Sequence, residues 1–310
     1  MIVASRSITN THRYTAFGLT VNSTFPIPEL AGSNSSTTRA DITISIGKIP
    51  EVLPQAVAVK HHAWTLGNQV WLNFANVGRF WINQGKDIIL DKNHPADDIE
   101  VRFYLLGAAL ACALVQRNIL PLHGCGIVSG EKAFLFLGES GSGKSTLAAK
   151  FQELGYSVLS DDICAVSTRN GSPPHLLVAY PQMKLGPTTL DYLGISYDTL
   201  LNFHNHRCKC FLPLLQSGLA SSYPIERIYF LKQSSRSFIK DIPKTDCLRQ
   251  LLLNTHRKAI VQSMCGVQKH FQQCIDILNY TSTFCFARPF DFEQLHSGVI
   301  KLKDHLSKTI

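Results

Sequence analysis

Residues 133–145 read Ala-Phe-Leu-Phe-Leu-Gly-Glu-Ser-Gly-Ser-Gly-Lys-Ser. The first five are apolar, as expected of a buried strand. The last eight match the phosphate-binding pattern G-x-x-x-x-G-K-[ST] at every fixed position. Residues 146–154 follow with the apolar spacing of a helix, because Leu147, Ala148 and Phe151 share one side. A strand, this loop and a helix in succession predict an α/β core built around a P-loop.

The P-loop residues suit a triphosphate and a magnesium ion. Glycines let consecutive backbone N–H groups face phosphate oxygens, and the following helix adds partial positive charge at its N-terminus. Lys144 supplies a full charge to the β- and γ-phosphates, and Ser145 supplies a hydroxyl to Mg²⁺. The residues expected to bind ATP are Gly138, Glu139, Ser140, Gly141, Ser142, Gly143, Lys144, Ser145 and Thr146. The motif alone does not separate a kinase from an ATPase, a GTPase, a transporter motor or a chance match.

Two adjacent aspartates, Asp161 and Asp162, come after a second apolar segment, residues 156–159. One helix and one strand separate them from Lys144. We therefore expect them at the carboxyl end of the strand beside the P-loop strand, where ligands bind in such sheets. Neighbouring side chains on a strand point in opposite directions. One carboxylate can then hold Mg²⁺ while the other accepts the proton of an attacking hydroxyl. A metal site without a general base is the alternative.

A histidine precedes the P-loop strand in the pair His123-Gly124. Residues 125–128 are expected to form a hairpin with residues 133–137 through the turn at 129–132. That hairpin brings His123 back towards the phosphate end. An isolated histidine is more often a packed or surface residue, so the position alone leaves both interpretations open.

The first hundred residues contain short strands broken by turns and carry no motif for chemistry. A helix is expected from Asp97 to Arg117, because acidic residues favour the start of a helix and basic residues its end. We therefore divide the chain into a strand-rich domain, residues 1–96, and a P-loop domain, residues 97–310. The P-loop domain ends with a helix. Strands are expected at 14–21, 40–46, 70–74, 79–82, 87–90, 224–231 and 285–288, and hairpin turns at 67–68 and 84–85.

The composition is that of a folded chain with a modest positive charge. The 310 residues are 45% hydrophobic and 17% charged, with a formal net charge of +8. These values are typical of globular proteins and exclude intrinsic disorder. No run of Lys or Arg focuses the charge, so we expect no nucleic-acid partner. The longest apolar run, residues 103–115, is shorter than the roughly 20 residues of a membrane span.

The N-terminus lacks the apolar stretch of a signal peptide, so we expect no membrane partner and a cytoplasmic location. The nine cysteines are then expected to be free thiols. A zinc site is one interpretation of the segment 204–210, His-Asn-His-Arg-Cys-Lys-Cys. Its ligands alternate along the chain, however, and this spacing fits no standard zinc knuckle. We expect Arg207 and Lys209 of this segment to bind a negatively charged group of the substrate instead.

Together these elements resemble the HPr kinase/phosphorylase family, whose catalytic core is related to phosphoenolpyruvate carboxykinase. That family has a His-Gly pair, a strand, a P-loop of the form G-[DE]-S-G-x-G-K-S, a helix, a glycine and a strand ending in Asp-Asp. The corresponding residues here are His123-Gly124, 138–145, Gly155 and Asp161-Asp162. The resemblance implies an α/β fold with an HPr-kinase-type P-loop core and a smaller, strand-rich N-terminal domain. It also implies that Lys144 and His123 belong to the active site, that Ser145 and Asp161 bind the metal, and that Asp162 accepts the proton.

The sequence departs from the bifunctional enzymes of that family farther along. Their signature has a metal-binding Glu and an Arg where this chain has Gln182 and Lys184. An amide is a weaker ligand for Mg²⁺ than a carboxylate. This exchange weakens the expectation that Gln182 makes a second metal contact, and with it the expectation of phosphorolysis.

The chain resembles more closely a divergent branch of HPr-kinase-like proteins encoded with lasso-peptide biosynthesis genes. Its members share segments like those at residues 17–30, 105–107 and 122–123, and the motif Y-P-Q-[ML]-[RK]-L, present here at 180–185. They phosphorylate the C-terminal serine of a precursor peptide, and the resemblance implies the same substrate here.

We therefore expect an ATP- and Mg²⁺-dependent phosphotransferase, a serine kinase acting on a peptide. His123 and Lys184 are expected to stabilise charge on the transferred group. The protein is also expected to be a homo-oligomer. The alternatives are a kinase/phosphorylase that acts on HPr and a regulatory P-loop module that senses ATP without transferring phosphate.

Overall fold

The computed structural model describes residues 11–33, 39–49, 55–168, 171–196, 201–203, 209–214, 216 and 218–308. The chain forms a mixed α/β structure that divides into two compact units. Unit 1 comprises residues 1–121 and 256–272, and unit 2 comprises residues 122–255 and 273–310. The domain division expected at residue 96 differs from this one, because the helix after residue 97 packs against a strand of unit 1.

Unit 1 is built on one large sheet. Among its described residues, nine strands follow the order β3-β1-β2-β4-β9-β8-β7-β6-β5. Most neighbouring strands are antiparallel, and β4 pairs in parallel with both β2 and β9. The strands are β1 (His12–Ala16), β2 (Leu19–Ser23), β3 (Ala31–Gly32), β4 (Ile42–Ile46), β5 (Val57–Lys60), β6 (Ala63–Leu66), β7 (Gln69–Phe74), β8 (Gly78–Asn83) and β9 (Asp87–Lys92).

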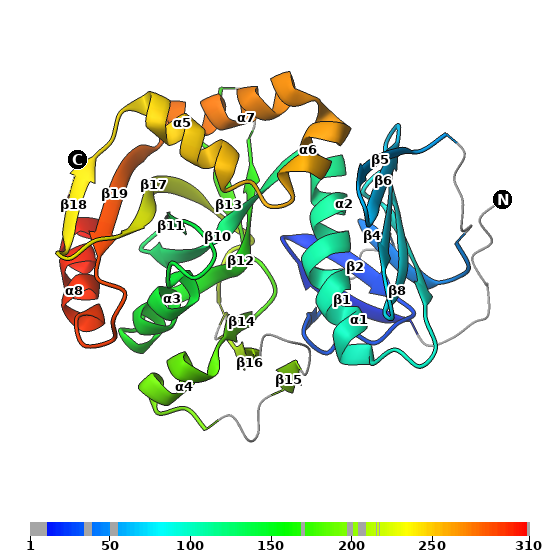
Figure 1. The fold of residues 1–310 in the computed structure, drawn as a ribbon, viewed down its shortest axis with the longest axis horizontal. Helices are drawn as coiled ribbons and strands as arrows, with labels where there is room; N and C mark the ends of the chain where they lie inside the picture. Colours follow the sequence, from blue (N-terminus) through cyan, green and yellow to red (C-terminus); the bar gives the residue numbers. More distant parts are fainter. Residues whose placement is uncertain are drawn as a thin grey trace. The chain divides into compact units, whose positions relative to one another are not determined.

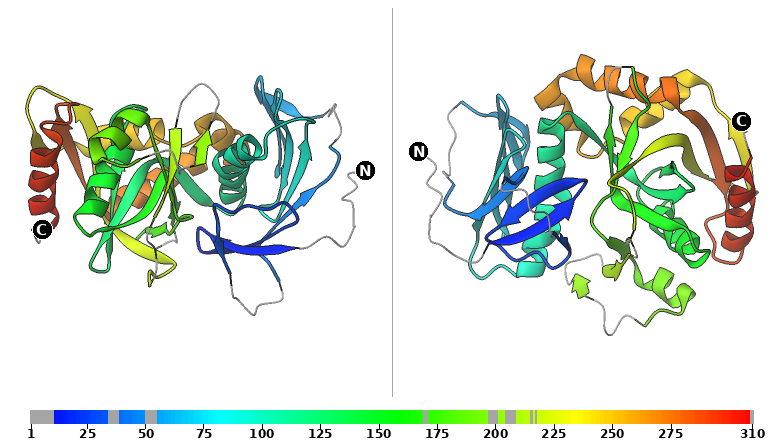
Figure 2. Two further views of the ribbon diagram at one scale, coloured as in Figure 1. Left: turned by 90° about the horizontal axis from the view of Figure 1, so that it is seen from below. Right: turned by 180° about the vertical axis from the view of Figure 1, so that it is seen from behind.

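One long helix packs on a face of this sheet (Figure 2). It runs through α1 (Asp98–Tyr104), the π-helical turn η1 (Leu105–Ala109) and α2 (Leu110–Gln116). The Asp97 side chain accepts a hydrogen bond of 3.0 Å from the Ile99 N–H and so caps the first turn. The helix expected at 97–117 is therefore confirmed. A shorter helix, α6 (Lys258–Cys265), packs beside α2.

Unit 2 is built on a second sheet. Within the described residues its order is β11-β10-β12-β13-β17-β19-β18, and an additional pairing joins β11 to β17. A small separate sheet has the order β14-β16-β15. The strands are β10 (Ile119–Ser129), β11 (Lys132–Leu137), β12 (Ser157–Ser167), β13 (His175–Leu177), β14 (Gln182–Leu185), β15 (Leu201–Phe203), β16 (Lys209–Pro213), β17 (Ser222–Gln233), β18 (Phe238–Asp241) and β19 (Ser282–Arg288). The remaining helices are α3 (Lys144–Glu153), α4 (Pro187–Leu193), α5 (Lys244–Leu253), α7 (Val267–Tyr280), whose first residues belong to unit 1, and α8 (Leu295–Leu306).

Three strands of this second sheet share a direction and so end at one edge. β11 pairs in parallel with β17, and β17 pairs in parallel with β19. β10 is antiparallel to β11, and the pairing of Gly124 with Leu137 brings His123 to the carboxyl end of β11. The hairpin expected through residues 129–132 is therefore confirmed. Residues that follow β11, β17 or β19 emerge at the same edge as His123.

Helices cover both faces of the sheet of unit 2 (Figure 1). α3 and α8 lie on one face, and α5 lies on the other. Phe136 of β11 is fully buried, and its ring stacks with Phe151 of α3 and with Tyr229 of β17 at centroid distances of 5.6 and 5.5 Å. Because the P-loop connects β11 to α3, this packing fixes the positions of both ends of the loop.

Most of the strands expected from the sequence are confirmed with small shifts at their ends. This holds for the strands near 40–46, 70–74, 79–82, 87–90, 224–231 and 285–288 and for the turns at 67–68 and 84–85. The single strand expected at 14–21 is wrong. Phe17 and Gly18 adopt left-handed φ values of 54° and 67°, which turn the chain so that β1 pairs with β2 as a hairpin.

The described cysteines are free thiols, as expected, and all of them except Cys265 are buried. Burial raises the pKa of a buried thiol, for example that of Cys112 to about 12, so it stays protonated at neutral pH. No helix within the described ranges has the length and apolar character needed to cross a membrane.

The position of Phe136 predicts a large loss of stability on truncation. Phe136→Ala removes a fully buried ring and is expected to lower the free energy of unfolding by about 3–5 kcal/mol. The control is Phe238→Ala in β18, whose side chain is 39% exposed and is expected to change it by about 0.5 kcal/mol or less. Urea unfolding should be followed by circular dichroism, since all three tryptophans lie in unit 1. Equal losses in the two variants would show that Phe136 is not part of a tightly packed core.

Candidate functional site

The P-loop leaves the carboxyl end of β11 and enters α3, in the strand–loop–helix order that the sequence predicts. Gly143, just before the helix, has a left-handed φ of 78°, a conformation that favours glycine. The ammonium group of Lys144 donates hydrogen bonds of 2.8 Å to the carbonyl oxygens of Gly138 and Glu139. It is thus held within the loop, next to the N–H groups of the first turn of α3. This arrangement concentrates positive charge at the start of α3.

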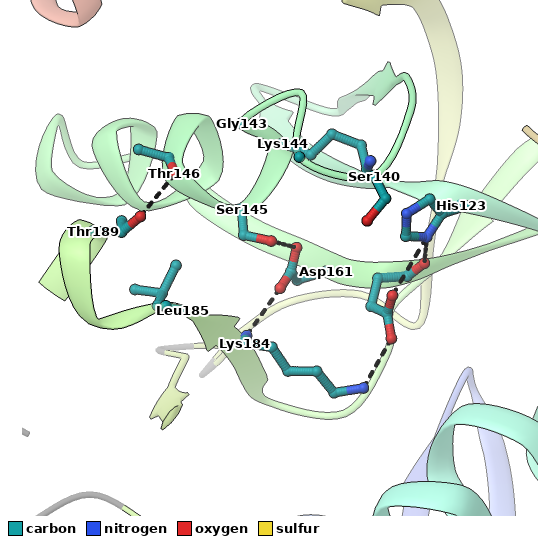
Figure 3. Close-up of a pocket in the computed structure, with 13 residues that line it drawn as sticks. His123, Ser140, Gly143, Lys144, Ser145, Thr146, Asp161, Lys184, Leu185 and Thr189 are labelled. Atoms are coloured by element: carbon teal, nitrogen blue, oxygen red, sulfur yellow. Dashed lines mark hydrogen bonds and ion pairs between the residues drawn. The ribbon is translucent and has the colours of Figure 1, made fainter. Parts of the chain in front are cut away.

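Asp161 is the buried anion that faces the P-loop (Figure 3). Its Oδ1 accepts a hydrogen bond of 2.8 Å from the Ser145 hydroxyl, and its Oδ2 accepts one of 2.9 Å from the Lys184 N–H. Burial raises the pKa of this carboxyl group, and the nearby charge of Asp162 adds to the rise, while the two hydrogen bonds act against it. One side chain therefore joins β12, α3 and β14.

Asp162 lies beside Asp161 and has different partners. Its Oδ2 accepts a hydrogen bond of 2.8 Å from the Lys184 ammonium, and its Oδ1 lies 3.4 Å from His123 Nδ1. The φ of Asp162 is 74°, in the left-handed region that few residues other than glycine adopt. The Ser160 hydroxyl donates a hydrogen bond of 2.9 Å to the Ile163 carbonyl oxygen, which braces the backbone on both sides of this irregularity.

This irregularity corrects two expectations about the aspartates. The pair does not lie at the end of its strand, because β12 continues to Ser167. The two side chains also do not occupy opposite faces, because a left-handed residue interrupts the alternation of the strand, and both carboxylates line one cavity. Two carboxylates in one cavity repel each other, and Lys184 offsets this by binding both, one through its N–H and one through its ammonium.

His123 reaches the cavity from β10. Its Nδ1 lies 3.2 Å from the Asp162 carbonyl oxygen and 3.4 Å from Asp162 Oδ1. Both neighbours are acceptors, so they favour the tautomer in which Nδ1 is the donor. The His123 N–H donates a hydrogen bond of 2.6 Å to the Asn254 carbonyl oxygen, which fixes this part of the strand. The adjacent Gly124 is required for space, because a Cβ there would overlap β11 and lie 2.8 Å from the Phe136 carbonyl oxygen.

Lys184 is a second buried cation of the site, beside Lys144. Burial by itself lowers the pKa of its ammonium group, but the charge of Asp162, its hydrogen bond to Lys184 and the charge of Asp161 outweigh that effect, and the pKa is raised. Lys184 is therefore a fixed positive charge at neutral pH. The structure brings it into contact with the two aspartates, although they are far from it in the sequence.

These groups surround an open cavity of about 230 Å³ at the start of α3. Most of the residues that the sequence predicted for the site line it. Among the newly found residues, Thr189 places its hydroxyl oxygen 3.1 Å from that of Thr146. The lining residues are His123, Ser140, Gly141, Gly143, Lys144, Ser145, Thr146, Asp161, Asp162, Lys184, Leu185, Gly186 and Thr189.

Some residues expected at the site lie elsewhere or outside the described part of the chain. Gly138, Glu139 and Ser142 form the P-loop without lining the cavity. Gln182 does not line the cavity either, and its buried Oε1 has no hydrogen-bond partner among the described residues. Lys209 lies in β16, opposite Phe203, where only the backbone is described. Arg207 lies outside the described residues, together with His204, His206 and Cys208 of the same segment.

A magnesium ion fits the oxygen donors that are present. Ser145 Oγ and Asp161 Oδ1 are hard oxygen ligands 2.8 Å apart at the start of α3. Mg²⁺ at nucleotide sites takes one or two protein ligands and completes its shell with phosphates and water. Within the described ranges, no group of three or more His, Cys, Asp or Glu side chains is arranged around one point, so a metal bound only by such side chains is not supported there.

Arg288 was not predicted from the sequence. It is the last residue of β19, and its guanidinium contacts the Cα side of Gly143, because a Cβ on Gly143 would overlap Nη2 and lie 3.6 Å from Cζ. The sequence did contain a signal for it. A charged residue at the carboxyl end of a core strand is a candidate ligand-binding residue in an α/β sheet.

Comparisons with known proteins give structural similarities that are distant. No family model matches the chain, and no curated protein matches it. Among solved structures, the chain is similar to the HPr(Ser) kinase/phosphatase from Coxiella burnetii, with a TM-score of 0.27 and 10% sequence identity. The similarity covers 60% of this chain and 94% of that chain. At this level of similarity, the activity of the chain has to be argued from the residues of its own site.

The raised pKa of Asp161 predicts that removing its charge stabilises the ligand-free protein. The unfolded value is about 4, so the folded state holds its proton to higher pH than the unfolded state does. This preference stabilises the fold at low pH, and the contribution is lost as pH rises through the folded pKa. Asp161→Asn is therefore expected to raise the free energy of unfolding, more at pH 8 than at pH 5, in urea titrations at several pH values.

The matched variant Asp162→Asn is expected to act in the opposite direction. It removes the carboxylate that pairs with the buried Lys184 ammonium and is expected to lower the free energy of unfolding by about 1–3 kcal/mol. Shifts of the same sign in the two variants would contradict the different roles of the two carboxylates.

Proposed function

We propose that this protein is an ATP-dependent kinase that transfers phosphate to a serine hydroxyl of a peptide. The observation that carries the proposal is the division between two carboxylates at the P-loop. Asp161 is bound to Ser145 at the start of α3, whereas Asp162 faces the open cavity between Lys184 and His123. A site that only senses ATP needs the first arrangement, and a site that also transfers phosphate needs the second.

The nucleotide-binding half of the site consists of the P-loop and the start of α3. Backbone N–H groups and the Lys144 ammonium would bind the β- and γ-phosphates, and Ser145 with Asp161 would hold the metal. When bound, Mg²⁺ offsets the negative charge of these phosphates. Burial raises the pKa of Asp161 because an anion is unfavourable there. A bound cation would stabilise the carboxylate and lower this pKa again.

The transfer step in this proposal uses Asp162. The serine oxygen forms a bond to the γ-phosphorus as the bond from that phosphorus to the β–γ bridging oxygen breaks, and ADP leaves. The hydroxyl proton passes to the Asp162 carboxylate. Lys184 and His123 lie within reach of the same carboxylate and would stabilise the charge of the transferred group. Positioning and electrostatics supply most of the catalysis in such reactions.

The acceptor in this proposal is the C-terminal serine of a lasso precursor peptide. Support comes from the sequence resemblance and from the presence of Gln182 and Lys184 in place of Glu and Arg. A terminal serine carries a carboxylate beside its hydroxyl, and a cation near the cavity would bind it. Lys209 lies on β16, the strand that pairs with β14, and Arg207 precedes it in the sequence.

A labelling experiment tests the acceptor. The protein is incubated with Mg²⁺, γ-labelled ATP and one of three additions: a lasso precursor ending in serine, the same peptide ending in alanine, or HPr. Label in the serine peptide alone is the expected result. Label in HPr would favour the HPr kinase instead, and label in no acceptor, with ATP bound, would favour the regulatory module.

Two variants test the roles of the residues. Asp162→Asn is expected to bind ATP with little change and to transfer phosphate about 10²–10⁴-fold more slowly, the range for loss of a general base. Lys144→Ala is expected to lose both ATP binding and transfer, because it removes the ammonium within the loop. Asp304→Asn, an exposed aspartate on α8, serves as the control and is expected to keep both activities. Full transfer by Asp162→Asn would overturn the assignment of the base.

A further inference from the structure

Arg288 lies at the same edge of the sheet as the P-loop. Its strand, β19, is parallel to β17, with Arg288 opposite Gln233, and β17 is parallel to β11, which leads into the loop. The Arg288 side chain is 4% exposed. It extends to the first residue of the loop–helix junction and packs against Gly143. A guanidinium thus stands directly beside the N-terminus of α3, close to the residue that precedes Lys144.

The hydrogen-bonding groups of this guanidinium are mostly unused. Nη1 donates a hydrogen bond of 2.9 Å to the Pro289 carbonyl oxygen. Nε is buried and has no hydrogen-bond partner in the described part of the chain. No carboxylate among the described residues forms an ion pair with Arg288. A buried group with unused donors costs free energy, so this geometry points to a ligand that accepts hydrogen bonds.

A second buried arginine in the same sheet shows what a purely structural role looks like. Arg227 is 1% exposed, and its two Nη groups donate hydrogen bonds to the carbonyl oxygens of His305 and Lys308 near the end of α8. Nη2 of Arg227 also lies 3.4 Å from Glu226 Oε1. The Nε of Arg227, like that of Arg288, has no hydrogen-bond partner in the described part of the chain, so the two arginines differ in the partners of their Nη groups. Arg288 holds a single carbonyl oxygen, its own neighbour's, and turns its Nη2 towards Gly143.

The charges around Arg288 also favour the binding of an anion. Burial lowers the pKa of its guanidinium, and Asp291 opposes this only in part. An arginine stays protonated in spite of such shifts. A buried cation, the Lys144 ammonium and the N-terminus of α3 therefore converge on one loop. Like charges held together in this way are stabilised by a multiply charged anion such as a polyphosphate.

The position of Arg288 also indicates which part of the nucleotide it meets. The groups proposed for transfer, Asp162, His123 and Lys184, lie on β12, β10 and β14. Arg288 comes from β19, which is separated from β11 by β17. The terminal phosphate must lie next to Asp162 for transfer, so a cation on the other side of the loop meets phosphates nearer the nucleoside.

We propose that Arg288 binds the phosphates that remain on the nucleotide after transfer, and so contributes equally to binding of ATP and ADP. The proposal rests on the proposed function, because it uses nucleotide binding at the P-loop and the position of the terminal phosphate beside Asp162, but it does not depend on the identity of the acceptor.

Calorimetric titration of the full chain with Mg-ATP and Mg-ADP tests this inference. Arg288→Gln is expected to raise the dissociation constants of both nucleotides by at least tenfold, about 1.4 kcal/mol, and to leave their ratio unchanged. Arg288→Lys keeps the charge and loses the planar fork, so it is expected to restore part of the affinity. The control is Arg249→Gln, an exposed arginine on α5, which removes the same charge and is expected to leave both constants unchanged.

The outcomes are distinguishable. Unchanged affinity in Arg288→Gln and Arg288→Lys, with tight binding by the wild type, would overturn this inference alone, even if both variants were less stable to heat. A loss confined to ATP would also overturn it, because the contact would then be to the terminal phosphate. Binding without transfer would overturn the kinase proposal, and an equal loss of affinity for ATP and ADP in Arg288→Gln would still support the contact of Arg288 with the phosphates that the two nucleotides share. If the wild type bound neither nucleotide, both the kinase proposal and the Arg288 proposal would be overturned.

Discussion

The arrangement of the cavity depends on one buried carboxylate, that of Asp161. Its two oxygens accept hydrogen bonds from Ser145 in α3 and from the N–H of Lys184 in β14. In the described part of the chain, β14 belongs to a small sheet that shares no strand pairing with the sheet of β12. The carboxylate therefore holds β14 at the place where the Lys184 ammonium can reach Asp162. Without it, the P-loop would remain, but the cation and the second carboxylate would not be positioned against it.

Asp161 and Asp162 combine charge repulsion between their carboxylates with backbone strain at Asp162. A left-handed residue other than glycine costs roughly 1–2 kcal/mol, and Asp162 adopts that conformation within a strand. Such a conformation persists only where its surroundings hold it. Here the Lys184 ammonium binds its carboxylate, and His123 Nδ1 faces both its carbonyl and its carboxylate oxygen. In return, two adjacent carboxylates face one cavity and accept hydrogen bonds from different groups, the N–H and the ammonium of Lys184, which a regular strand could not achieve.

The features that could be predicted from the sequence depend on neighbouring residues. The features that could not be predicted depend on contacts between distant segments. The strand, loop and helix at 132–153 follow from an apolar run and a motif, and the return of His123 follows from a short hairpin. The left-handed turn at Asp162 could not be predicted, because nothing in the residues Ser160-Asp161-Asp162 forbids a regular strand. The packing of Arg288 against Gly143 depends on the order of β11, β17 and β19, which no local pattern specifies.

The ion pair between Lys184 and Asp162 limits which cation could bind a C-terminal serine in the proposed reaction. Its ammonium already forms an ion pair of 2.8 Å with Asp162, and that pair keeps the base in place. If the peptide carboxylate took this ammonium, the serine hydroxyl would approach a base that had lost its partner. A second cation is therefore needed for the carboxylate. The backbone of β16 runs beside β14 with Cys210 opposite Leu185, and Lys209 precedes Cys210 in the sequence. In the proposed reaction Lys184 of β14 would therefore stay with the base, and the substrate carboxylate would bind a different cation.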